Sequence, residues 1–161
     1  EYILSRCRNS HERLRNGINS YGVFNLKKHI DGDCGITLFL IFKSHKTKMI
    51  FEKCLIKEGI SVGGTSAMIN ITETSPITNH GLYNKNNPPY GEGYLQGNID
   101  INEKFNNTNQ IINDFLPIGI GPLYEDKDID DIIEAINKVA YWVSELSVNN
   151  PSLLYEYIDK N

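Results

Sequence analysis

The sequence predicts one α/β (α+β) domain, and two stretches carry that prediction. Residues 36–42 form an unbroken apolar run rich in β-branched and aromatic side chains. The run is too short to cross a membrane and predicts a buried strand that is covered on both faces. Apolar residues between 129 and 146 recur at helical spacing and predict a long amphipathic helix. A chain of 161 residues, 40% of them apolar, can bury one sizeable core and is short for two.

The apolar run opens a unit that we expect to be a strand, a helix and a second strand. Ser44 follows the run and offers a hydroxyl to the free amides of a first helical turn. Within 45–58 the apolar residues fall on one helical face, and lysines and glutamates occupy the others. Gly59 stands where a left-handed helix C-cap is expected, and residues 60–62 predict the next strand.

The other expected elements are shorter or less regular. Residues 4–18 carry apolar side chains at alternating spacings of three and four, which predicts an opening helix. Because the chain starts inside this pattern without a cap, we expect a fragment of a longer protein whose opening helix exposes an apolar stripe. Residues 21–26 predict a short strand and 107–115 a short helix. The prolines of 117–123 favour an edge strand.

Charge and cysteine content narrow the function classes. A net charge of −4 and a pI near 5.6 argue against a nucleic-acid partner, because such binding depends on clustered Lys and Arg. The arginines at 6, 8, 13 and 15 are interpreted as a solvated helix face.

Three widely spaced cysteines favour a reduced, cytoplasmic protein. No signal peptide or membrane-length apolar run is found, and the aspartates at 126–131 are interpreted as a helix cap instead of a metal site.

No catalytic motif with a self-evident mechanism is present. Cys34 could be a nucleophile with one of the four histidines as its base, but a cysteine directly before a buried strand is more often packed as a small hydrophobic residue. The long irregular stretch 72–105 is expected to be a structured, functional loop. Within it, His80 with Tyr83 is the better polar candidate.

The order of these features resembles the C-terminal small domain of the DegT/DnrJ/EryC1/StrS family. These are pyridoxal 5'-phosphate (PLP) dependent aminotransferases that act on nucleotide sugars and related amino sugars. The resemblance covers most of the chain. It rests on NSHERL at 9–14, GDCG at 32–35 with the strand after it, LIKEGI at 55–60, and LPIGIGP at 116–122 leading into DIDDIIEAINKV at 128–139.

The resemblance implies a fold-type-I enzyme in which a large domain carries PLP. The small domain, a short and mostly antiparallel sheet with helices on one side, closes over it. The chain would then comprise a lead-in helix from the missing large domain (1–20), the small domain (21–147) and a C-terminal tail (148–161). The lysine that binds PLP lies upstream in this family, so no lysine here is assigned as catalytic, and the residues that bind the cofactor are unknown. The lysines at positions 43, 46, 48, 53 and 57 are interpreted as polar-face residues.

The resemblance also implies a substrate-binding segment. By analogy Asn79, His80 and Tyr83 hydrogen-bond the substrate. Gly63, Gly64 and Thr65 would let the backbone approach it, although a simple β-bulge at the two glycines is favoured on sequence grounds.

The implied full-length protein is a cytoplasmic homodimer that transfers an amino group from glutamate or glutamine to a keto sugar, free or nucleotide-linked. The fragment alone is expected to be inactive, and no metal, nucleic acid or membrane is expected to bind.

Two alternative functions stay open. One is a regulatory small-molecule-binding module of the ACT or ferredoxin-like type, which two matching β-α-β halves would favour. The other is a non-catalytic interaction domain that uses the aromatic loop.

Overall fold

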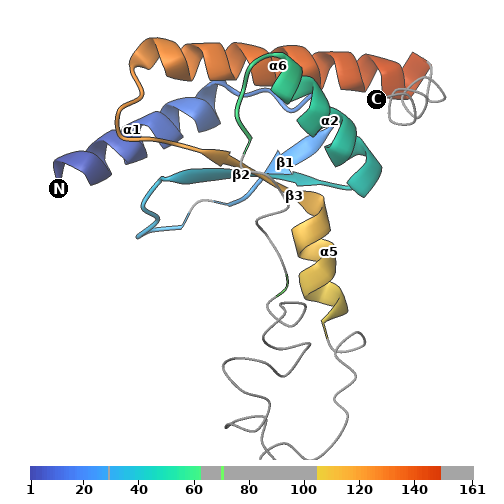
Figure 1. Ribbon diagram of the computed structural model, residues 1–161, viewed down its shortest axis with the longest axis horizontal. Helices are drawn as coiled ribbons and strands as arrows, with labels where there is room; N and C mark the ends of the chain where they lie inside the picture. The colour runs from blue at the N-terminus through green and yellow to red at the C-terminus, as the bar shows by residue number, and fades with distance from the viewer. Residues whose placement is uncertain (29, 63–69, 71–104, 150–161) are drawn as a thin grey trace, which may run out of the picture. The chain divides into compact units, whose positions relative to one another are not determined.

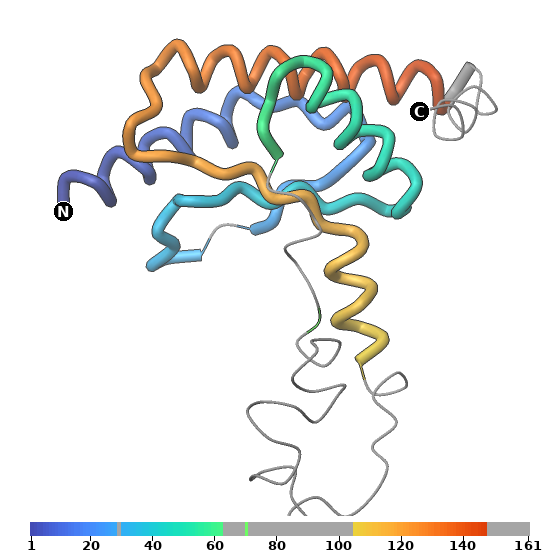
Figure 2. Tube along the Cα trace, in the orientation of Figure 1, coloured from blue at the N-terminus to red at the C-terminus, as the bar shows by residue number. Residues whose placement is uncertain are grey.

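A computed structural model describes residues 1–28, 30–62, 70 and 105–149 (Figures 1 and 2). They fall into two compact units. One contains Asn70 and most of helix α5, and there the Asn70 side-chain amide donates to Asn109 Oδ1 at 2.8 Å. The other contains the remaining elements. In chain order the elements are α1 (Tyr2–Gly17), β1 (Phe24–Leu26), β2 (Thr37–Phe42), α2 (His45–Lys57), α5 (Asn106–Asp114), β3 (Phe115–Gly119) and α6 (Asp126–Asn149).

Strand β2 is the centre of a three-stranded antiparallel sheet with the order β1-β2-β3. Phe24 of β1 lies opposite Phe42, and Leu116 of β3 lies opposite Leu40. An edge strand is therefore confirmed in this stretch, although β3 covers Phe115–Gly119 and includes only 117–119 of the predicted range 117–123. Pro117 is tolerated there because an edge strand needs hydrogen-bond donors on one side only.

Helices α1, α2 and α6 all lie on one face of this sheet (Figure 1). Side chains along the strands alternate accordingly, because successive residues point to opposite faces. The expectation that 36–42 is covered on both faces stays a prediction: α1, α2 and α6 cover one face, and Phe39 and Ile41 on the other face are half-buried. An apolar run lacks the polar alternation that would show which face the helices cover. The residues facing the helices are almost fully buried and comprise Phe24, Leu38, Leu40, Phe42, Leu116 and Ile118.

Helix α6 packs across both α1 and α2, which in turn contact the strands. Its buried residues repeat with helical spacing, as predicted: Ile129, Ile132, Ala135, Ile136, Val139, Ala140 and Val143. This arrangement of helices over one side of a small antiparallel sheet defines a small α+β domain.

Within the described residues the predicted β-α-β unit is not found. Helix α2 ends where expected, because Gly59 adopts φ +84° and the Ile60 amide donates to the Leu55 carbonyl at 3.0 Å. Residues 60–62 are not a strand, however, and β2 pairs with β1 and β3 instead. Ser44 occupies the N-cap position of α2, but its hydroxyl makes no capping hydrogen bond.

Helix α1 is part of this core and not an exposed element. Its apolar stripe, expected to be exposed, is buried at Cys7, His11 and Leu14, because α1 packs against β2 and α6. No helix in the described part of the chain combines the length and apolarity needed to cross a membrane.

The arginines of α1 make surface contacts with other parts of the chain. Arg13 binds Asp126 at 2.9 Å and Asp130 at 2.7 Å, at the first turns of α6. The Arg6 guanidinium donates to the Tyr124 carbonyl, and Arg8 Nε donates to the Asp33 carbonyl. These contacts lie at the surface, and Arg8 and Arg13 are exposed, which agrees with the interpretation of a solvated helix face. The sequence pattern did not reveal the partners, because they come from distant parts of the chain.

Candidate functional site

The substrate-binding residues predicted by resemblance lie outside the described residues. This applies to Asn79, His80, Tyr83, Gly63, Gly64 and Thr65. Their role stays a prediction.

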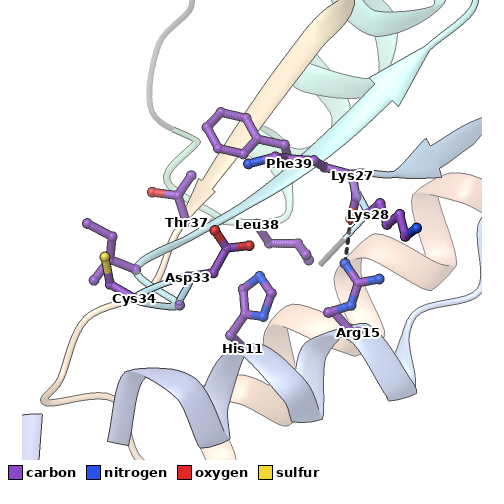
Figure 3. Close-up of a pocket in the computed structure, with 11 residues that line it drawn as sticks. His11, Arg15, Lys27, Lys28, Asp33, Cys34, Thr37, Leu38 and Phe39 are labelled. Carbon is purple, nitrogen blue, oxygen red and sulfur yellow. Dashed lines mark hydrogen bonds between the residues drawn. The ribbon is translucent and has the colours of Figure 1, made fainter. Parts of the chain in front are cut away.

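A different polar site does lie within the described part of the chain. It is a pocket of about 250 Å³ between α1, the end of β1 and the loop that leads into β2 (Figure 3). We call it the basic pocket. Its lining consists of His11, Arg15, Lys27, Lys28, Cys34, Gly35 and residues 33 and 36–39.

Gly35 brings the two walls of the basic pocket together. It adopts φ +74°, a left-handed conformation that favours glycine. A Cβ at this position would lie 3.0 Å from both the Arg8 Cα and the Cys7 carbonyl oxygen. The loop backbone can therefore touch α1 only because residue 35 has no side chain. Arg8 Nε holds the same contact by donating to the Asp33 carbonyl at 3.0 Å.

The basic pocket is lined by three cationic side chains. Arg15 Nη1 donates to the Lys27 carbonyl at 2.6 Å, which fixes the guanidinium against the wall. The Lys27 ammonium lies 5.5 Å from the centre of the Phe39 ring. Among the described residues, neither Arg15, Lys27 nor Lys28 has a carboxylate partner within ion-pair distance.

His11 and Asp33 also meet in the basic pocket. The His11 side chain is 7% exposed, and the Asp33 carboxylate points toward its ring (Figure 3). Asp33 Oδ2 also accepts from the Ile30 amide at 3.3 Å, which stabilises the turn. Within the described residues no three side chains of metal-binding type are grouped to hold a metal ion.

Cys34 lines the basic pocket but is not packed as predicted. It is exposed, so the interpretation as a small buried hydrophobic residue is wrong. The glycines on either side turn the chain outward before the strand begins, with φ +95° at Gly32 and +74° at Gly35. The Cys34 sulfur is directed away from the His11 ring (Figure 3), so the two do not form a nucleophile and base.

Lys48 of α2 is a residue that sequence reasoning missed. Its side chain is 1% exposed, so its interpretation as a polar-face residue is wrong. Burial lowers the pKa of Lys48 below its usual 10.5, although the carboxylates of Glu52 and Asp114 act in the opposite direction. The spacing of residues in α2 could have predicted this burial. Lys48 precedes the buried residues Phe51 and Leu55 by three and seven positions, which places it on the same face of the helix.

The face of the sheet opposite α1, α2 and α6 is a second candidate surface. Phe39, Ile41, Phe115 and Pro117 lie on it and are half-buried, and the Phe39 and Phe115 ring centres are 5.9 Å apart. Apolar side chains clustered on one sheet face usually mark a contact with another structure. We call this set the open face.

Comparison with known proteins identifies no family for this chain. The chain matches no protein-family model, and a search of curated proteins finds no significant match.

Proposed function

We propose that this chain is the small domain of a PLP-dependent aminotransferase that acts on a keto sugar. The observation that carries the proposal is that α1, α2 and α6 all lie on the same face of the sheet. Three helices cover one face, and the open face presents Phe39, Ile41 and Phe115. A small domain that closes over a partner domain needs such a surface.

The order of elements supports the same proposal. The LPIGIGP segment supplies β3, and its Ile120 amide continues the pairing by donating to the Ile36 carbonyl at 2.8 Å. The DIDDIIEAINKV segment lies inside α6, and NSHERL lies inside α1. These are the element types expected from the resemblance at those segments.

The described residues do not themselves form a PLP site. A lysine that attacks a carbonyl needs a lowered pKa and access to a ligand cavity. Lys48 is the described lysine with a lowered pKa, but it does not line the basic pocket. We therefore assign PLP to the large domain, where the cofactor supplies the electron sink for amino transfer.

The small domain contributes closure and recognition in this proposal. Covering the site excludes water and holds the substrate in a reactive orientation. The predicted contacts of Asn79, His80 and Tyr83 with the keto sugar belong to this step. Glutamate or glutamine is the proposed amino donor, and the active enzyme is proposed to be a homodimer.

The test extends the reading frame upstream of Glu1 and examines the longer product. We expect it to bind PLP with a visible absorption band. Borohydride reduction should then attach the cofactor to a lysine of the upstream domain, located by mass spectrometry. The 161-residue chain, reduced with PLP in parallel, is the control and should show no stoichiometric adduct.

A colourless extended product without amino-transfer activity would overturn the proposal. Such a protein that bound a small metabolite would favour the regulatory alternative. The described residues do not favour it now, since they contain one antiparallel sheet and no pair of β-α-β halves.

Within the extended enzyme, His80→Ala tests the predicted substrate contact. We expect kcat/KM for the keto sugar to fall about 100-fold, the size typical of a lost acid–base or orienting group. His45→Ala is the matched control and should change the ratio less than about twofold, since His45 is exposed at the start of α2. Equal losses in the two variants would remove His80 from the site.

A further inference from the structure

We propose that the basic pocket binds the phosphate group of a small phosphorylated molecule. The proposal does not depend on the aminotransferase assignment. It rests on the lining of the pocket and on the charges gathered there.

The charge in the pocket is opposite in sign to that of the chain. Arg15, Lys27 and Lys28 line it together with one carboxylate, Asp33, whereas the whole chain carries a net charge of −4. The described residues that line the pocket therefore carry two positive charges in excess. A phosphomonoester carries between about one and a half and two negative charges at pH 7, so it balances this excess. A single carboxylate would leave part of it uncompensated.

The donors suit phosphate in geometry as well as in charge. Arg15 uses Nη1 to bind the Lys27 carbonyl, which orients the guanidinium and leaves its other N–H groups for a ligand. A planar guanidinium binds two phosphate oxygens at once, and lysine ammonium groups add mobile point charges. The Lys27 ammonium lies 5.5 Å from the centre of the Phe39 ring, and Lys28 is exposed. Both side chains have flexible four-carbon stems, so in this proposal their ammonium groups move toward a phosphate that Arg15 binds.

The pocket favours a small molecule over an extended polyanion. A cavity of about 250 Å³ accommodates a phosphate with a few carbon atoms. The adjoining hollow shares His11, Arg15 and Gly35 but also contains the Glu12 carboxylate. A nucleic-acid backbone that continued from the pocket would meet this negative charge. Glu12 and Asp33 can instead accept hydrogen bonds from hydroxyl groups on a phosphorylated ligand.

The experiment is an NMR titration of the full 161-residue chain with inorganic phosphate and with glycerol 3-phosphate. Sodium chloride at matched ionic strength is the reference. We expect saturable shifts of the amides of residues 33–37 and Lys28 with both phosphates, and none with chloride. Tighter binding of glycerol 3-phosphate would identify an organic phosphate as the ligand, and equal binding would identify free phosphate.

Two double variants make the test specific. Lys27→Gln with Lys28→Gln should weaken phosphate binding at least about tenfold, since two charge-assisted contacts are lost. Lys43→Gln with Lys46→Gln removes the same charge from exposed positions outside the pocket and should change the affinity less than about twofold. Amide dispersion confirms that each variant is folded. Absence of saturable shifts, or equal weakening by both variants, would overturn the proposal.

Discussion

Gly35 is the residue on which the basic pocket depends. Gly35→Ala should lower the free energy of unfolding by about 2–4 kcal/mol, because it adds left-handed strain to a clash with α1 backbone atoms. Gly22→Ala is the matched control, since Gly22 has φ +78° but nothing within 4 Å of its Cβ position. It should cost only about 1–2 kcal/mol of strain. Urea unfolding of both variants checks this, and equal losses would show that the contact with Arg8 is unimportant.

Lys48 is expected to make stability depend on pH. Its pKa is lower in the folded protein than its usual 10.5, so the unfolded chain binds this proton more tightly. Burial of the charged ammonium therefore lowers the free energy of unfolding. This destabilisation is fully present below the folded-state pKa and disappears as the pH rises through 10.5. Lys48→Met should therefore raise the urea concentration at the unfolding midpoint at pH 7. The difference in midpoint between the variant and the native chain should shrink as the pH approaches 10.5.

Urea unfolding of Lys48→Met and of the native chain at several pH values measures this effect. Lys46→Met, at an exposed position of the same helix, controls for the change in side-chain type and total charge. A stabilisation by Lys48→Met that did not vary with pH would mean that burial of the ammonium is not its cause.

At the scale of elements, the joint between α1 and α6 depends on Asn137. Its Oδ1 accepts from the Asn19 amide at 2.7 Å, and its Nδ2 donates to the Gly17 carbonyl at 3.0 Å. The side chain therefore satisfies backbone groups at the end of α1 that have no partner within the helix. The two helices also approach closely here, since a Cβ on Gly17 would lie 2.6 Å from Ile133 Cδ1.

Asn137→Ala should lower the free energy of unfolding by about 1–3 kcal/mol, because two backbone groups lose their partner at once. The neighbouring Lys138 makes an exposed ion pair with Glu58 at 2.7 Å. Its replacement by alanine should cost no more than about 1 kcal/mol. Thermal and urea unfolding compare the two variants, and a similar loss in both would show that Asn137 does not secure the joint.

For the whole molecule, the open face leads to a prediction about association. We expect self-association through Ile41 and Phe115, since apolar sheet surface that is not fully buried favours contacts between copies. Ile41→Ser with Phe115→Ser should weaken association at least about tenfold in sedimentation equilibrium. Ile56→Ser with Leu123→Ser, at exposed positions off the sheet, should leave it unchanged. A chain that stays monomeric at high concentration would contradict this expectation.

The sequence by itself determined the positions and types of most elements. Apolar periodicity located α1, α2 and α6, and the unbroken run at 36–42 located β2. Gly59 marked the end of α2, and Pro117 marked β3 as an edge strand. These signals work because helix period, strand length and backbone dihedral preferences are properties of neighbouring residues.

Tertiary structure decided which surfaces those elements bury and which polar groups meet. Only the packed sheet shows that α1, α2 and α6 all cover the same face of β2 and that residues 60–62 do not join the sheet. Arg15 joins Lys27 and Lys28 in one pocket because Gly35 lets the loop contact α1, a contact that no local pattern encodes. Lys48 is buried and Cys34 is exposed for a similar reason. Burial depends on what distant segments cover, whereas local patterns record only the polarity of the residue itself.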